Sequence, residues 1–345
     1  MTVVAAAMEP CVVFRGIGDL RLEERPVPVP GAGEVRITPL AVGICGTDAH
    51  ILSGAYAARP GTILGHEIAG LVSAVGAGVT TVREGDLVSV EPHLYCGACR
   101  YCRLGWEHLC PEKRAFGVHL DGGMAASVVV PARLAYVVPD GVDPAVACMA
   151  EPVGCGIHGI DRLAPLAGLP LLIIGGGPAG LMLLALASRT GVGPIVVAEP
   201  DAARRAAALA GGADVVLDTA DAGWQDAARA ITGGHGFDQL IEAAGSPDGL
   251  GVAIGLAARH ARILVYGVAH PDAVVGVRPN DIYARELTIM GAALNPYTHA
   301  RAVAMVGDLG LERLAPGRYA LADFAEAFEA QRLRRHLKVV ITPNA

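Results

Sequence analysis

The chain has 345 residues, of which 52% are hydrophobic and 18% are charged, and its formal net charge is −7. This length predicts two domains, and the apolar content excludes a disordered chain. The acidic balance and the scattered Lys and Arg residues argue against a nucleic-acid-binding surface.

Eight cysteines occur in a chain whose first ten residues lack the layout of a secretory signal. We therefore expect a cytoplasmic protein whose cysteines are thiols or metal ligands rather than disulfides. The most apolar stretch, residues 171–187, is shorter than a membrane-spanning helix and contains four glycines and a proline. We therefore expect no membrane partner.

In chain order, the first 150 residues contain short Val-, Ile- and Thr-rich runs separated by Gly and Pro, a pattern that predicts a mostly β domain. The predicted strands are residues 34–39, 68–75, 87–90, 126–130 and 135–138. From about residue 152 to residue 288, apolar runs alternate with Ala-rich helical segments, which is typical of a parallel sheet covered by helices in an α/β fold. These runs are residues 171–174, 195–198, 215–217, 239–242, 263–266 and 288–290.

The last part of the chain has two helical stretches, residues 298–309 and 322–332, and a final apolar run at 338–341. That run could return to the first domain as a strand, and spacing alone leaves this open. The densest basic cluster lies beside it, and we expect a solvated surface there. The cluster consists of Arg334, Arg335, His336 and Lys338.

Four cysteines give the strongest local signal, with two residues between successive members of the first three and seven before the fourth. They are Cys96, Cys99, Cys102 and Cys110. Four thiolates at this spacing can enclose one zinc ion in a tetrahedral shell. Because no coordination position stays open, the pattern predicts a structural zinc, whereas a redox pair would explain only two of the four.

A second set of donors combines Cys45 with the sequence Gly65-His66-Glu67. Sulfur, nitrogen and oxygen donors from three residues would leave zinc a fourth position for water or substrate. Asp48 has the chemistry of a partner that orients a histidine ligand. The spacing alone leaves open that Cys45 is a buried apolar residue and that Gly65-His66-Glu67 is a turn.

A glycine-rich turn follows the predicted strand 171–174 and opens an apolar helix, which is the context of a dinucleotide-binding fingerprint. Gly175 allows the tight turn, Gly177 lets the backbone approach a pyrophosphate, and Gly180 lets the helix pack closely on the strand. Glu199 lies nineteen residues after Gly180, where a carboxylate binds the adenosine ribose and favours NAD over NADP. Arg204 and Arg205 follow closely and weaken that preference. We expect the cofactor at Gly175, Gly177, Pro178, Ala179, Gly180, Glu199 and Arg204.

These motifs, in this order, resemble those of the zinc-dependent medium-chain dehydrogenase/reductase (alcohol dehydrogenase) family, most closely its polyol, butanediol and threonine dehydrogenase branch. The resemblance covers essentially the whole chain. It rests on residues 43–48, 65–67, the four cysteines, residues 150–152 and the glycine fingerprint.

The resemblance implies a GroES-like, β-rich catalytic domain formed by residues 1–151 and 291–345, with a structural zinc lobe at about 91–113. It implies that residues 152–290 form a Rossmann NAD-binding domain with a doubly wound parallel sheet. The implied partners are two zinc ions per chain, NAD, a small alcohol substrate, and further copies of the chain in a tetramer or dimer.

The resemblance also assigns roles to site residues. Cys45 and His66 match catalytic zinc ligands, Glu67 matches a direct ligand of polyol dehydrogenases, and Glu151 lies in the third-ligand region, where it binds zinc directly or through water. Cys155 is a rival soft ligand that we expect to be buried structure. Thr47 and His50 match a relay that carries the substrate proton to solvent.

The function implied is reversible hydride transfer from a secondary alcohol, namely a polyol, sugar alcohol or cyclitol, to NAD. L-threonine 3-dehydrogenase or 2,3-butanediol dehydrogenase activity is an alternative with the same chemistry. A non-catalytic dinucleotide-binding protein is a remote alternative, because such a protein should have lost catalytic ligands and none is missing here.

Overall fold

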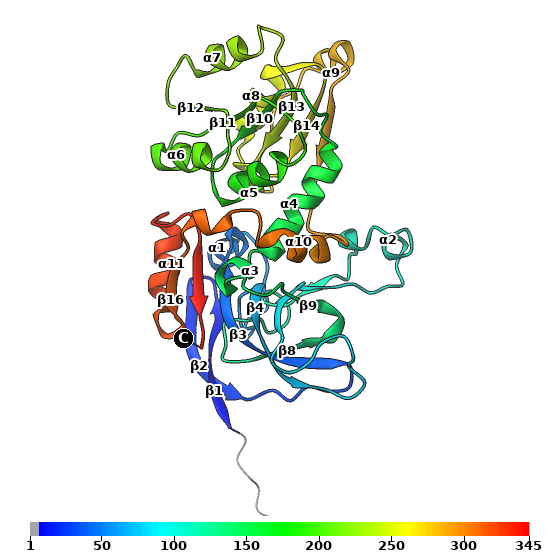
Figure 1. Cartoon of the computed structure of the whole chain (residues 1–345), viewed down its shortest axis with the longest axis vertical. Coiled ribbons are helices and arrows are strands. Elements are labelled where there is room, and N and C mark those ends of the chain that lie inside the picture. The colour runs from blue at the N-terminus through cyan, green and yellow to red at the C-terminus, as the bar shows by residue number, and fades with distance from the viewer. Residues whose placement is uncertain (1–6, 345) are drawn as a thin grey trace, which may run out of the picture. The chain divides into compact units, whose positions relative to one another are not determined.

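The computed structural model describes residues 7–344, and the chain divides into two compact units. The first unit comprises the residues up to Pro152 together with those from Pro296 onward, and the second comprises Val153–Asn295. Figure 1 labels most of the helices and strands of both units. No helix within residues 7–344 is long and apolar enough to cross a membrane.

The first unit is built on a seven-stranded sheet in the order β16-β17-β3-β4-β5-β9, with β8 also paired to β3. Its strands are β3 (Glu34–Ile44), β4 (Glu67–Val75), β5 (Leu87–Val90), β8 (Val128–Pro131), β9 (Ala135–Val137), β16 (Gly317–Ala320) and β17 (Val339–Thr342). The C-terminal run left open by spacing is β17, which lies antiparallel beside β3 with Val339 opposite Ile44 (Figure 1). The C-terminal strand β17 therefore extends the sheet beside β3, the strand that ends one residue before Cys45.

Two smaller sheets flank this one. β1 (Met8–Gly16) and β2 (Asp19–Pro26) form an antiparallel hairpin that the hydrophobic pattern did not predict, because most residues of β2 are charged and none is buried. β6 (His93–Leu94) pairs with β7 (Arg114–Ala115), so the segments that enter and leave the four-cysteine lobe lie side by side. The helices of this unit are α1 (Gly46–Ser53), α2 (Arg100–Arg103), α3 (Pro144–Ala147), α10 (His299–Val306) and α11 (Phe324–Arg332). Short 3-10 helices cover Glu107–Leu109, Ala132–Leu134, Leu311–Leu314 and Leu321–Asp323.

The second unit is a six-stranded sheet in the order β12-β11-β10-β13-β14-β15, and every neighbouring pair is parallel. The strands are β10 (Leu171–Ile174), β11 (Ile195–Ala198), β12 (Val215–Leu217), β13 (Phe237–Glu242), β14 (Ala257–Val265) and β15 (Thr288–Gly291). The helices are α5 (Pro178–Ala187), α6 (Ala202–Ala210), α7 (Trp224–Ile231), α8 (Pro247–Leu256) and α9 (Pro279–Arg285), while α4 (Ala150–Leu163) spans the boundary between the units.

This strand order is that of a doubly wound dinucleotide-binding sheet, with the order reversing beside β10. The four residues of β10 are buried, as expected for a central parallel strand covered on both faces. The predicted α/β class with a parallel sheet is confirmed, and each of the six runs predicted for it is a strand, although β13 and β14 begin earlier than their apolar runs.

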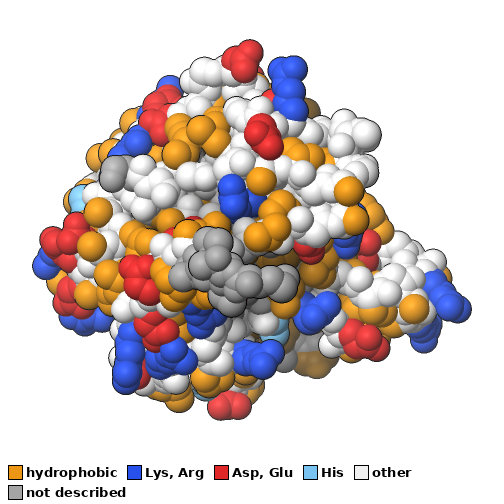
Figure 2. Space-filling model, turned by 90° about the horizontal axis from the view of Figure 1, so that it is seen from below, with side chains coloured by type: hydrophobic (Ala, Val, Ile, Leu, Met, Phe, Trp, Pro, Cys, Tyr) orange, Lys and Arg blue, Asp and Glu red, His pale blue; other side chains and the backbone are white. Residues whose placement is uncertain are grey.

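One face of the molecule carries side chains of both charges. On the face shown in Figure 2, Lys and Arg side chains lie among Asp and Glu side chains and do not gather into one basic patch. Interspersed charge of this kind gives no single-sign field on this face.

Candidate functional site

The register of β3 and β4 brings the second set of donors together. Gly43 lies opposite Glu67 in this antiparallel pair, so Cys45, two residues beyond Gly43, and His66, one residue before Glu67, lie at the same end of the two strands. One donor atom from each of Cys45, His66 and Glu67 lies within 4.8 Å of the other two. The geometry therefore gathers sulfur, nitrogen and oxygen donors that the sequence places 21 positions apart.

Asp48 links Cys45 to His66. Its Oδ2 accepts a hydrogen bond from the backbone N of Cys45 at 2.9 Å, which caps the start of α1, and its Oδ1 lies 3.7 Å from Nδ1 of His66. Burial raises the pKa of Asp48. Burial alone would lower the pKa of His66, but the Asp48 carboxylate and a hydrogen bond with Cys45 raise it well above its usual value.

This donor set fits a zinc ion. Oδ1 of Asp48 and Nδ1 of His66 are buried and have no hydrogen-bond partner. These two atoms therefore form no hydrogen bonds that would compete with the binding of a metal ion. Thiolate, imidazole and carboxylate are the ligands of open zinc sites. Cys45, His66 and Glu67 would hold the ion.

Glu151, on the first turn of α4, is 5% exposed and does not belong to this group of three, although its charge also raises the pKa of His66. Thr47 lies close by, with its Oγ1 3.8 Å from Sγ of Cys45. His50 is half-buried and follows Thr47 by three positions in α1, so the two side chains share one side of the helix. The roles of Glu151, Thr47 and His50 stay predictions.

Lys338 is a residue that sequence reasoning missed. The basic cluster at 334–338 predicted a solvated surface, and this is wrong for Lys338, which is 4% exposed. Its ammonium nitrogen lies 2.7 Å from Oε1 of Glu67. The sequence did contain a signal for its burial, namely the apolar strand that begins at the next residue. A side chain just before a buried strand lies near the core.

The four cysteines of the lobe also converge. Donor atoms of Cys96, Cys99, Cys102 and Cys110 all lie within 4.8 Å of one another, and these cysteines form no disulfide. Backbone N–H groups of Ala98 and Cys99 lower the pKa of Cys96 to about 7, so that this thiol ionises readily. Four thiols around one point, one already close to a thiolate, fit a closed zinc shell.

The glycine fingerprint forms a strand-turn-helix unit between β10 and α5. Gly175 has a φ of +105°, in the region that favours glycine, and Gly177 is the N-cap of α5. A Cβ atom on Gly180 would lie 1.9 Å from the carbonyl oxygen of Gly175, so the close packing of helix on turn requires glycine there. Pro178 and Ala179 are the first residues of α5.

Glu199 and the arginines after it lie beside this turn. Oε2 of Glu199 accepts a hydrogen bond from the backbone N of Gly176 at 2.7 Å. Arg205 is occupied by the carbonyl oxygens of Glu199 and Pro200 and by an ion pair with Asp218. Arg204 lies 3.9 Å from Glu199 and is the nearest side chain to the open position at Gly177. Of the two arginines, only Arg204 is therefore placed against the turn.

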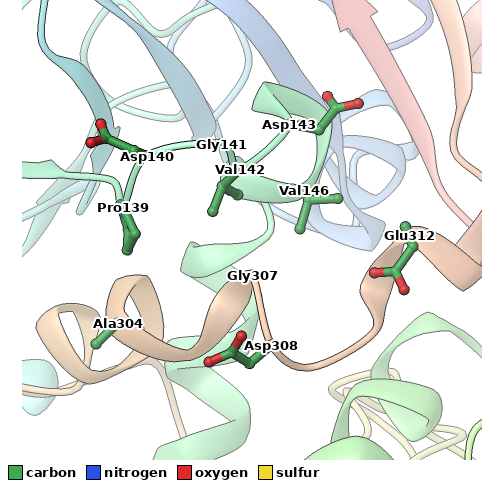
Figure 3. A pocket seen from close by; sticks show the side chains of 10 residues that line it. All are labelled: Pro139, Asp140, Gly141, Val142, Asp143, Val146, Ala304, Gly307, Asp308 and Glu312. Atoms are coloured by element: carbon green, nitrogen blue, oxygen red, sulfur yellow. The ribbon is translucent and has the colours of Figure 1, made fainter.

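A pocket of about 410 Å³ lies between the loop before α3 and the residues around the end of α10 (Figure 3). Its acidic residues are Asp140, Asp143, Asp308 and Glu312. Asp143 caps α3 and pairs with Arg318. None of the predicted zinc or cofactor residues lines this pocket.

Comparison with known proteins decides the family. A model described as the alcohol dehydrogenase GroES-like domain matches residues 31–140, and one described as zinc-binding dehydrogenase matches residues 178–306. The chain belongs to the zinc-dependent medium-chain dehydrogenase family. The predicted family and the pairing of a GroES-like domain with a Rossmann domain are thereby confirmed.

Members of this family resemble the chain over almost its whole length. L-threonine 3-dehydrogenase of Pyrococcus horikoshii is 36% identical over 92% of this chain and 94% of that protein. D-arabinitol dehydrogenase 1 of Uromyces fabae is 32% identical over 94% and 95%, respectively.

Two solved structures extend the comparison. A putative zinc-binding dehydrogenase of Sinorhizobium meliloti, bound to NADP, has a TM-score of 0.93 and 31% identity, covering 98% of this chain and all of that one. A dehydrogenase of E. coli complexed with NADH has a TM-score of 0.90 and 29% identity, with the same coverage. As a zinc-dependent medium-chain dehydrogenase, the chain is an enzyme of the alcohol dehydrogenase type that uses NAD or NADP.

Proposed function

We propose that this enzyme transfers hydride reversibly from a secondary alcohol, of the polyol, sugar alcohol or cyclitol class, to NAD. The observation that carries the proposal is the convergence of Cys45, His66 and Glu67, since a thiolate, an imidazole and a carboxylate leave one coordination position open. The arabinitol dehydrogenase among the relatives supports a polyol substrate. A second candidate is L-threonine 3-dehydrogenase activity, which the relative from Pyrococcus horikoshii favours.

The chain's own residues would bind the alcohol and remove its proton. Zinc, when bound, supplies a Lewis acid that lowers the pKa of the alcohol, and NAD supplies the hydride acceptor. In our proposal Thr47 accepts the hydroxyl proton at Oγ1 while it releases its own hydroxyl proton, which His50 passes to solvent. Asp48 keeps the His66 ring in position through its carboxylate. Glu151 is proposed as a further ligand, direct or through water.

The test is NAD reduction on a panel of polyols, cyclitols, 2,3-butanediol and L-threonine, before chelation, after chelation and after zinc is returned. We expect turnover to disappear with the metal and to return with zinc. Turnover that survives complete chelation would contradict the proposal. The preferred substrate on the panel decides between the polyol and threonine candidates.

Two cysteine variants locate the metal. Cys45→Ala should fold, lose turnover and retain one zinc per chain out of two, because the four-cysteine lobe is a separate site. The matched control is Cys155→Ala, which should retain both zinc ions and turnover. Loss of the zinc in Cys155→Ala and its retention in Cys45→Ala would move the site to the rival cysteine.

We also propose that the enzyme is a homotetramer. Light scattering after size exclusion at micromolar concentration measures its mass, and a monomer or a dimer would refute the tetramer.

A further inference from the structure

The ion pair between Lys338 and Glu67 is enclosed by the first unit. The two side chains are 5% and 1% exposed, and Nζ of Lys338 lies 2.7 Å from Oε1 and 2.5 Å from Oε2 of Glu67. The same Nζ donates to the carbonyl oxygen of Ile44 at 3.1 Å. The ammonium group thus contacts both oxygens of a carboxylate that is also one of the three metal donors.

The backbone leaves room for this pair at one glycine. Gly43 lies opposite Glu67 in the β3–β4 ladder, and a Cβ atom there would lie 1.9 Å from Oε2 of Glu67 and 3.1 Å from Cε of Lys338. Any other residue at position 43 would displace the carboxylate. β17, which pairs with β3 at Ile44, brings Lys338 to this place from the far end of the chain.

The contacts of Lys338 fit an ammonium ion, because its Nζ lies against a carboxylate and donates to a backbone carbonyl oxygen. Separating a buried ammonium from a carboxylate at this distance is costly, because each group would become an uncompensated buried charge. We therefore expect the pair to stay in contact.

We propose that Lys338 is a positioning residue that holds one oxygen of the Glu67 carboxylate back from the metal and so keeps a coordination position open for substrate. The inference rests on the metal site of the proposed function. Glu67 interacts with two cations in this proposal, the Lys338 ammonium and the metal beside Cys45 and His66. Without Lys338 both carboxylate oxygens are free to bind the metal, so Glu67 binds it more tightly, through two oxygens, and fills the position that substrate needs.

The test measures zinc release as well as turnover. Zinc leaving the holoenzyme is followed with a chromogenic chelator, and the four-cysteine zinc serves as an internal reference. In Lys338→Met, which keeps the apolar stem but not the charge, we expect release from the Cys45 site to slow about tenfold and kcat to fall about tenfold. Lys338→Arg should restore both to near the wild-type values. Release that is unchanged or faster in folded Lys338→Met would overturn the proposal.

A cobalt-substituted enzyme provides a spectroscopic readout. The visible absorption of Co²⁺ weakens when a fifth ligand is added, so Lys338→Met should show weaker bands than wild type. If Lys338→Met does not fold, the comparison is made between Glu67→Gln and the double variant Lys338→Met/Glu67→Gln, which contains no lone buried charge. Equal zinc release from these two supports an action through Glu67, and unequal release contradicts it.

The zinc content of the wild-type enzyme separates a failure of the Lys338 proposal from a failure of the proposed function. If wild-type enzyme holds only the four-cysteine zinc, the metal site at Cys45 is absent and the proposed function fails with it. If wild-type enzyme holds both ions and only the effect of Lys338 is missing, the proposed function stands and the positioning role does not.

Discussion

Oγ of Ser89 lies 3.1 Å from Nε2 of His299 in the interior of the first unit, although 210 positions separate the two residues in the chain. Both side chains are fully buried, and the ring of Tyr136 packs against His299 with the centroids 4.9 Å apart. The hydroxyl group of Tyr136 donates to Oε2 of Glu91 at 3.2 Å. A histidine and a carboxyl group with displaced pKa values therefore flank one tyrosine.

His299 should make the enzyme sensitive to acid. Burial lowers the pKa of His299 to about 3, against 6.5 for an exposed histidine, so the folded chain binds fewer protons than the unfolded chain between these values. Its contribution to stability is complete above pH 6.5 and is lost as the pH falls toward 3. Between pH 7.5 and pH 5 this loss is about 2 kcal/mol. His299→Gln should lack it, as measured by urea unfolding at both pH values; the same loss in variant and wild type would refute the assignment.

Glu91 should act in the opposite sense. Burial raises the pKa of Glu91 to about 7 from 4.5, so the folded chain binds more protons and stability decreases as the pH rises through 7. From pH 5 to pH 7.5 the loss is about 2 kcal/mol, close to what His299 gains over the same range. Glu91→Gln should therefore become more stable relative to wild type as the pH rises, by the same urea measurement. A stability difference that does not change with pH would show that Glu91 is ionised in both states.

Two glycines of the fingerprint, Gly177 and Gly180, should respond differently to alanine. Gly177 has only the tip of Arg204 within 4 Å of an added Cβ, so Gly177→Ala should fold normally but bind NAD at least about tenfold more weakly, because the methyl group fills the space of the pyrophosphate. Gly180→Ala should lower the free energy of unfolding by about 3 kcal/mol, because its Cβ overlaps the carbonyl oxygen of Gly175. Calorimetric titration with NAD and urea unfolding separate the two effects. Equal losses of stability in both variants would contradict this division.

Cofactor preference should depend on Glu199 and Arg204. Glu199→Gln keeps a side-chain oxygen for the backbone N of Gly176 but removes the negative charge that repels a 2′-phosphate. We expect the ratio of kcat/KM for NADP to that for NAD to rise by roughly tenfold or more. Adding Arg204→Ala should cancel the gain, because Arg204 is the arginine placed against the turn. A wild-type enzyme that already prefers NADP would refute the assignment of Glu199.

The parts of the site that are formed by residues close together in the sequence could be predicted from the sequence. The four cysteines of the lobe lie within fifteen residues, and the glycine turn between strand and helix is equally local, so their spacing alone specifies their geometry. The alternation of apolar runs and helices likewise specified the parallel sheet, because each strand and helix must bury its own apolar face.

The remaining features were decided by the tertiary structure. The β3–β4 register places Cys45 beside His66, and the return of β17 to β3 buries Lys338 against Glu67. The charge pattern had indicated a solvated surface for Lys338, since a local pattern carries no information about a partner 271 positions away. Sequence by itself determined the family, the fold class and the types of donor. Pairing between strands that are far apart in the sequence determined which charged side chains lie in contact, because burial and electrostatic interaction depend on proximity in space.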